Sequence, residues 1–150
     1  MAARPRGGEW LEDEVAGWRR AGIDAVLSLL TAGEERDLGL NQEADAVRGR
    51  GMDFLSLPIP DRQVPGSETE VAAVLERLNS RLSSGGNVVV HCRQGVGRSG
   101  MVATCLLITR GLDPAAAVRK VSAARGVAVP ETAEQRHWID HYAAISASPK

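Results

Sequence analysis

The chain has no excess of charge of one sign and no long apolar run. Its 150 residues carry a formal net charge of −1, so composition gives no signal for a nucleic-acid partner. No stretch approaches the length of a membrane span, and residues 1–8 contain no apolar signal-peptide core. Its two cysteines fit a reducing compartment. We therefore expect a cytoplasmic protein without a membrane span.

Motifs for cofactors are also missing. The chain contains no Walker loop, no dinucleotide fingerprint and no acidic cluster typical of a metal site. His137 and His141 lie four residues apart, but no third ligand with convincing spacing accompanies them, and we expect surface residues. The chemistry is predicted to need neither a metal nor a cofactor.

Composition and patterning predict one α/β domain over residues 1–150. A hydrophobic content of 43% is enough for a core, and no internal repeat or long linker interrupts the chain. The expected strands are residues 25–29, 54–57 and 87–90, the last as the central strand. The expected helices are residues 10–20, part of 33–51 with Asn41 as N-cap, 67–84, a segment from 98 or 99 onward, one from 114, and one after Pro130. Short apolar strands separated by helices indicate a mostly parallel sheet with helices on both faces.

A glycine-rich segment, residues 91–100, follows the expected strand at 87–90 and carries the strongest functional signal. Five residues separate Cys92 from Arg98, and Gly95 and Gly97 permit a curl in which backbone N–H groups surround one anion. A helix starting just beyond would face the same anion with its positive end, and the guanidinium of Arg98 can grip two phosphoryl oxygens. The predicted phosphate-binding residues are Arg93, Gln94, Gly95, Val96, Gly97 and Arg98.

These positive groups would favour the thiolate of Cys92, which is the nucleophilic form. A buried cysteine beside a core histidine is the plainer interpretation of residues 91 and 92. The two glycines and Arg98 count against it, so the segment is predicted to be a catalytic phosphate-binding loop.

The pattern His-Cys, five residues, Arg-Ser resembles the signature loop of the cysteine-based protein tyrosine and dual-specificity phosphatases. The upstream run Pro-Ile-Pro-Asp at residues 58–61 resembles the kinase-associated, dual-specificity-like branch. The resemblance implies the same fold, with Cys92 attacking phosphorus in line and Arg98 binding the phosphoryl oxygens. It also implies that the Ser99 hydroxyl assists breakdown of the cysteinyl-phosphate and that His91 orders the loop.

Phosphate ester cleavage also needs a proton for the leaving oxygen. Asp61 is our candidate general acid, because it follows the expected strand at 54–57 on a proline-stiffened loop, and an Asp in a comparable loop does this in dual-specificity phosphatases. The alternative is a turn residue paired with Arg62. Gln135 resembles the glutamine that some members use to position substrate or water, and its alternative is an exposed helical residue.

The predicted activity is hydrolysis of phosphate monoesters, phosphotyrosine and also phosphoserine or phosphothreonine in proteins. Arg62, Arg93, Arg98 and Arg136 could form a positive rim, and Arg93 keeps phosphoinositides or small phosphorylated molecules open as alternative substrates. A non-catalytic phosphate-binding module is a further alternative, disfavoured by the joint presence of Cys92, Arg98 and Asp61. A sulfurtransferase is another, disfavoured by His91, the Arg98-Ser99 pair and Asp61. The sequence carries no signal for oligomeric state.

Overall fold

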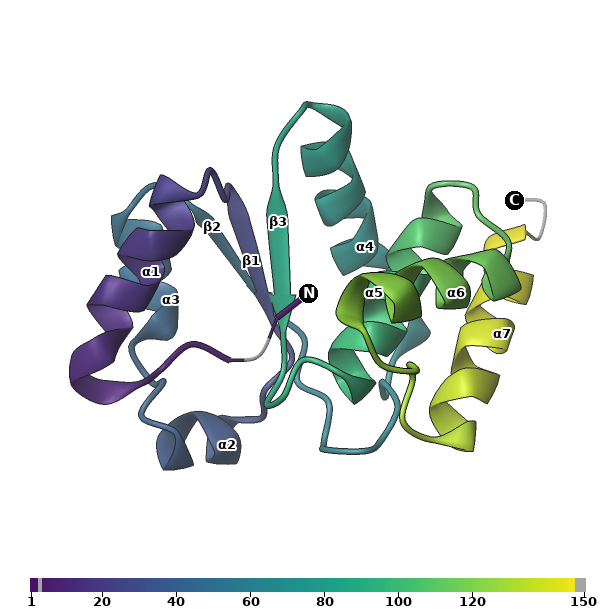
Figure 1. Cartoon of the computed structure of the whole chain (residues 1–150), viewed down its shortest axis with the longest axis horizontal. Helices are drawn as coiled ribbons and strands as arrows, with labels where there is room; N and C mark the ends of the chain where they lie inside the picture. Colours follow the sequence, from purple (N-terminus) through teal and green to yellow (C-terminus); the bar gives the residue numbers. More distant parts are fainter. Residues whose placement is uncertain (3, 148–150) are drawn as a thin grey trace.

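A parallel three-stranded sheet forms the centre of the computed structural model, which describes residues 1–2 and 4–147 (Figure 1). The strands are β1 (Ala25–Ser28), β2 (Asp53–Ser56) and β3 (Val88–His91), in the order β2-β1-β3. The helices are a 3₁₀ turn (Gly8–Trp10), α1 (Leu11–Arg20), α2 (Ala32–Asp37), α3 (Glu43–Gly49), α4 (Glu68–Ser83), α5 (Gly97–Thr109), α6 (Pro114–Arg125) and α7 (Ala133–Ala147). Because all three strands run the same way, their carboxyl ends meet at one edge of the sheet.

Helices cover both faces of the sheet, as the sequence predicts (Figure 1). Successive side chains of β1 alternate between faces, so Leu27 enters one hydrophobic cluster and Val26 the other. The cluster around Leu27 is filled from α4, α5 and α7, and the cluster around Val26 from α1 and α3. This double burial explains why the strands read as continuous apolar runs. None of the described helices is long and apolar enough to cross a membrane.

Three details differ from the sequence-based expectations. The central strand is β1, which pairs with both neighbours, whereas β3 meets only an isolated bridge to Ala2 on its other side in the described structure. The order of parallel strands depends on crossover connections, which the apolar pattern does not encode. Asn41 is not an N-cap, because α3 begins at Glu43 and its cap, Gln42, makes no side-chain bond. Helix α5 begins at Gly97, one residue earlier than expected.

Close packing of α5 brings the segment before α7 to the carboxyl edge of the sheet. Gly100 of α5 faces Val129, and a Cβ added to this glycine would lie 2.7 Å from the Val129 Cβ. Only a glycine allows this approach, which places residues 126–132 beside the loop that follows β3.

Replacing Gly100 by alanine should therefore destabilise the fold. We expect Gly100→Ala to lower the free energy of unfolding by about 2 kcal/mol, the ordinary cost of overpacking a filled core. Gly17→Ala, inside α1 with only the Arg20 side chain nearby at 3.8 Å, is the matched control. It should raise stability by about 0.5–1 kcal/mol. Urea unfolding measures both, and equal effects would refute the packing argument.

Candidate active site

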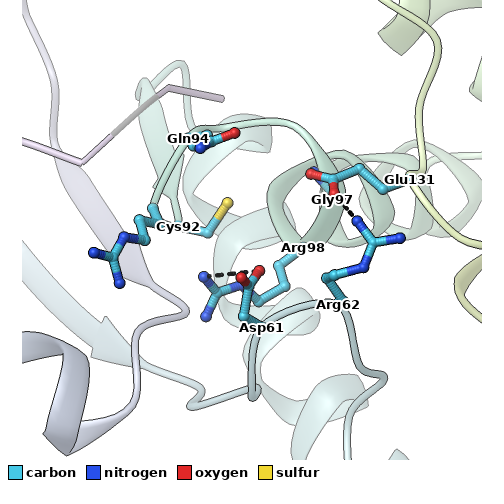
Figure 2. A pocket seen from close by; sticks show the side chains of 8 residues that line it. Asp61, Arg62, Cys92, Gln94, Gly97, Arg98 and Glu131 are labelled. Atoms are coloured by element: carbon cyan, nitrogen blue, oxygen red, sulfur yellow. Dashed lines mark hydrogen bonds and ion pairs between the residues drawn. The ribbon is translucent and has the colours of Figure 1, made fainter.

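Cys92 directly follows β3 and lines a pocket of about 180 Å³ at the carboxyl edge of the sheet. The residue is 3% exposed, and Figure 2 shows its sulfur facing the space that Asp61 and Arg98 also border. The complete lining consists of Asp61, Arg62, Cys92, Arg93, Gln94, Gly97, Arg98 and Glu131. Two segments distant in sequence, the loop after β2 and the segment before α7, thus join the loop after β3.

The loop between β3 and α5 is held from outside by Arg125 of α6. Its Nε donates to the Gly95 carbonyl at 2.7 Å and its Nη2 to the Gln94 carbonyl at 2.8 Å. In a trans peptide the C=O of one residue and the N–H of the next point in opposite directions. Because the carbonyls of Gln94 and Gly95 face Arg125, the N–H groups of Gly95 and Val96 point away from it. Gly95 has φ +76°, the left-handed conformation that we expected a glycine to adopt in this loop. Val96 provides no side-chain cap to α5.

Arg98 is 2% exposed, and a carboxylate that the sequence analysis missed compensates its charge. Glu34 of α2 accepts two bonds from the guanidinium, at 2.7 Å from Nη1 and 2.9 Å from Nη2. Nη1 also donates to the Ile59 carbonyl at 2.8 Å, and Nη2 lies 3.5 Å from Asp61. Burial alone would lower the pKa of Arg98, but Glu34, with the charges of Cys92 and Asp61, raises it. The guanidinium is therefore fixed in orientation and permanently charged.

Asp61 lies on the loop after β2, and its side chain is 65% exposed. Asp61 and Arg62 do lie in a turn, but they are not paired with each other, because Arg62 donates to Glu131 at 2.9 Å while Asp61 faces Arg98 (Figure 2). Arg62 has φ +64°, a conformation that is uncommon outside glycine. The side chains of these neighbours consequently engage opposite sides of the pocket.

Glu131 is a second carboxylate that sequence reasoning missed. Its Oε1 accepts the Gly97 N–H at 3.2 Å, while its Oε2 accepts from Arg62. The Gly97 N–H stands at the start of α5, where backbone donors and the helix dipole favour an anion. The carboxylate therefore occupies part of the predicted phosphate cradle.

Gln135 is fully buried, so the exposed alternative for this residue is wrong. Its Oε1 accepts the Glu131 N–H at 3.2 Å, and its Nε2 donates to the Gln63 carbonyl at 3.1 Å. Gln135 is not part of the pocket lining. It fastens the segment that carries Glu131 to the loop that carries Asp61.

Ser99 and His91 lie beneath the loop. Ser99 is fully buried on α5, and among the described residues its hydroxyl has no hydrogen-bond partner. His91 is also fully buried and is paired with Glu43 of α3. The remaining cysteine, Cys105, is buried on α5, and burial raises the pKa of its thiol, which stays protonated.

The two histidines of α7, His137 and His141, are exposed, as predicted. Within residues 1–2 and 4–147, no three His, Cys, Asp or Glu side chains are grouped to hold a metal ion. Of the four arginines expected at the rim, Arg136 is not in the pocket lining and faces Asp140 on its own helix.

Removing the Glu34 charge should destabilise the protein in a pH-dependent way. Glu34→Gln leaves the buried Arg98 guanidinium with only the exposed Asp61 carboxylate, 3.5 Å away, as counter-ion, which we expect to cost about 3 kcal/mol near neutral pH. The bond from Arg98 lowers the pKa of Glu34 in the folded state. Its contribution is therefore complete above the ordinary glutamate range and is lost as pH falls through the lowered value. The unfolding free energies of the wild type and of Glu34→Gln should converge at acid pH. A difference that stays constant with pH would contradict the role of Glu34 as counter-ion of Arg98.

Replacing Glu131 should change anion affinity. Glu131→Gln removes a negative charge that competes for the Gly97 N–H, so inorganic phosphate should bind roughly 5-fold more tightly, the equivalent of an exposed ion-pair contact. Calorimetric titration with phosphate measures this without relying on turnover. Glu134→Gln, exposed on α7 outside the pocket, is the control and should leave affinity unchanged. Unchanged or weaker binding in Glu131→Gln would show that the carboxylate does not compete.

Comparison with known proteins places this geometry in context. Residues 2–112 match the family model described as "Polymorphic toxin system, DSP-PTPase phosphatase". The cyclin-dependent kinase inhibitor 3 of Rattus norvegicus is 28% identical over 128 residues, which cover 83% of this chain and 59% of the relative. The chain thus spans 59% of the length of this curated relative.

Solved structures agree in fold. The active form of Tk-PTP is 32% identical, with a TM-score of 0.77 over 89% of this chain and 86% of that one. Kinase-associated phosphatase, with its catalytic-site cysteine substituted by serine, is 21% identical, with a TM-score of 0.89 over 99% of this chain and 86% of that one. At this lower identity the second likeness concerns the fold alone.

Proposed function

The chain belongs to the DSP-PTPase phosphatase family, and we propose that it hydrolyses phosphate monoesters. The proposed substrates are phosphotyrosine and also phosphoserine or phosphothreonine in proteins. The observation that carries this proposal is the shared pocket of the Cys92 thiol, the buried Arg98 guanidinium and the Asp61 carboxyl. A nucleophile, an anion-binding group and a proton donor are the three parts that ester cleavage by covalent catalysis requires.

In the first step, the Cys92 thiolate attacks phosphorus, the P–S bond forms, and the bond to the leaving oxygen breaks. Asp61 gives its proton to that oxygen, which departs as an alcohol or phenol. The equatorial phosphoryl oxygens are bound by Arg98 and by backbone N–H groups of residues 93–98. Because Glu34 fixes the guanidinium before substrate arrives, little reorganisation is needed in the transition state.

In the second step, water attacks the cysteinyl-phosphate and Asp61, now ionised, accepts its proton. The P–S bond breaks and inorganic phosphate leaves. The buried Ser99 hydroxyl has no partner among the described residues and is free to donate to the departing Cys92 sulfur. His91 and Gln135 act at a distance, by holding the loop and the two flanking segments.

The charges of the pocket favour a single phosphoryl group over a polyphosphorylated headgroup. Arg98 is compensated by Glu34, and Arg62 by Glu131. Of the three pocket arginines, Arg93 alone has no ion-pair partner in the described part of the chain. Several free cations would be needed to bind several phosphates, so phosphoinositides are the second candidate substrate class. The proposal includes one catalytic domain acting in a reducing compartment such as the cytoplasm, because Cys92 must stay a free thiol.

A comparison of leaving groups tests the roles of Asp61 and Cys92 together. In the presence of chelator, the protein should release phosphate from para-nitrophenyl phosphate and from a phosphoserine peptide, and Cys92→Ser should abolish both activities. Asp61→Asn should slow the peptide reaction by roughly 100-fold, a typical contribution of general acid catalysis. In the pre-steady-state burst, which follows the first step alone, it should slow release of nitrophenolate far less, because nitrophenolate leaves without a proton.

Asp45→Asn, exposed on α3 outside the pocket, is the matched control and should behave as wild type. Equal losses on both substrates in the first step of Asp61→Asn would exclude the general-acid role. Activity that survives in Cys92→Ser would exclude the nucleophile. A folded, reduced wild type without turnover would favour the phosphate-binding module, and turnover of phosphoinositides alone would favour the second substrate class.

A further inference from the structure

A second cavity, of about 280 Å³, is enclosed by α2, α3, the link between them and β2 (Figure 1). It shares no lining residue with the pocket of Cys92, and the chemical steps above do not use it. The polar residues of its lining are Glu35, Asn41, Glu43, Arg48 and Ser56. Two of the five are carboxylic acids, so the cavity differs in charge from the arginine-lined pocket.

Glu43 brings a buried acceptor to this cavity. Its side chain is 1% exposed, and its Oε2 lies 2.5 Å from the His91 Nε2. The other oxygen, Oε1, has no hydrogen-bond partner among the described residues. Whether the pair is a carboxylate with an imidazolium or a neutral carboxyl whose Oε2–H donates to the imidazole, Oε1 only accepts hydrogen bonds. A buried acceptor without a donor is unfavourable, so the cavity suits a group that carries N–H or O–H.

Glu35 of α2 adds a carboxylate that no cation compensates. Burial and then the charge of Glu43 raise the pKa of Glu35, while the charge of His91 opposes the shift. Within the described part of the chain, the Glu35 side chain forms no ion pair. A carboxylate in this situation is stabilised by any positive charge that enters the cavity.

Arg48 is the one basic residue of the lining, and its guanidinium is engaged elsewhere. Its Nη2 donates to the Phe54 carbonyl at 3.4 Å, and its Cζ lies 5.8 Å from the centroid of the Phe54 ring. It pairs with neither Glu35 nor Glu43 in the described structure. The positive charge that these acidic groups would accept is therefore not supplied by the neighbouring arginine.

The ligand set is too small for a metal ion. A calcium ion takes roughly six to eight oxygen ligands, several of them from carboxylates. Across residues 1–2 and 4–147, no three His, Cys, Asp or Glu side chains are grouped to hold a metal. The cavity offers two acidic side chains, and the amide oxygen of Asn41 and the hydroxyl of Ser56 are its neutral acceptors. These groups fit a cation that needs fewer partners.

A primary ammonium group has the matching chemistry. It combines one positive charge with three N–H donors, enough for Glu35, the Oε1 of Glu43 and one neutral acceptor. Leu40, Ala44 and Phe54 supply the apolar part of the lining, against which an alkyl stem can pack. An ammonium on a short alkyl chain thus satisfies both kinds of wall.

We propose that the cavity between α2, α3 and β2 binds an alkylammonium group, with Glu35 and the Oε1 of Glu43 as its acceptors. A small amine and the side chain of a lysine present this same group. The site does not depend on the proposed phosphatase activity, and its occupancy is measured without turnover.

A chemical-shift titration of the wild-type protein with n-butylammonium tests the proposal. Backbone amides of residues 35, 41–44 and 54–56 should shift, with a dissociation constant in the millimolar range that is ordinary for so small a ligand. 1-Butanol lacks the charge and tetramethylammonium lacks the N–H donors. Each should bind roughly 10-fold more weakly or worse, the effect of losing charge-assisted hydrogen bonds.

A second ligand distinguishes the two sources of the group. Nα-acetyl-lysine amide carries the ammonium on a peptide-like body. If it binds as well as n-butylammonium, the site accepts a lysine side chain. If n-butylammonium binds and the lysine derivative does not, the site accepts small amines. Both results support the proposal.

Variants locate the binding. Glu35→Gln should weaken n-butylammonium binding roughly 5-fold, the equivalent of one partly exposed ion pair. Asp45→Asn removes the same charge from an exposed position on α3 outside the cavity and should leave the affinity unchanged. Equal effects of the two variants would show attraction by net charge alone and would contradict the assigned acceptors.

Three further results would overturn the proposal. Absence of shifts in the wild type would leave the cavity to water. Tighter binding of Ca²⁺ or Mg²⁺ at the same amides would make it a metal site. Binding of n-butylammonium only in Arg48→Ala would show that the arginine itself fills the cavity in solution.

Discussion

The structure depends on the burial of one guanidinium. Arg98 is 2% exposed, and removing such a charge from water is costly unless it is paired and hydrogen-bonded. Its partners follow the two other strands: Glu34 lies after β1, and Ile59 and Asp61 lie after β2, while Arg98 itself lies after β3. A single side chain thus ties together the three segments that the parallel sheet brings to one edge. The same contacts that stabilise the fold orient the anion-binding group.

A second set of contacts, from the C-terminal helices, holds the pocket from the other side. Arg125 binds the carbonyl groups of the loop after β3, and Gln135 links the backbones of Glu131 and Gln63. Three carboxylates, Glu34, Glu43 and Glu131, each contact a different part of that loop or its flanks. A pocket that reads as strongly basic in sequence is therefore largely neutralised. This balance suits reversible binding of one phosphoryl group.

The sequence predicted the features that depend on residues close together in the chain. Short continuous apolar runs located the strands, and the spacing of Cys92, the glycines and Arg98 predicted the loop because its geometry depends on adjacent residues. The partners of that loop could not be predicted this way, since Glu34, Glu43 and Glu131 lie 64, 48 and 34 residues from the groups they bind. Gln135 illustrates the same limit, because composition favoured exposure and only tertiary packing buries it. The Thr31–Glu34 capping box marks the start of α2 but gives no sign of Arg98.

Direct detection of the covalent intermediate tests the central claim. Asp61→Asn should still be phosphorylated by para-nitrophenyl phosphate, whose leaving group needs no proton, but should hydrolyse the cysteinyl-phosphate slowly. Rapid quenching during turnover, followed by peptide mass spectrometry, should therefore find phosphate on Cys92. Phosphate on another side chain, or turnover with no phosphorylated enzyme at any time, would contradict the account.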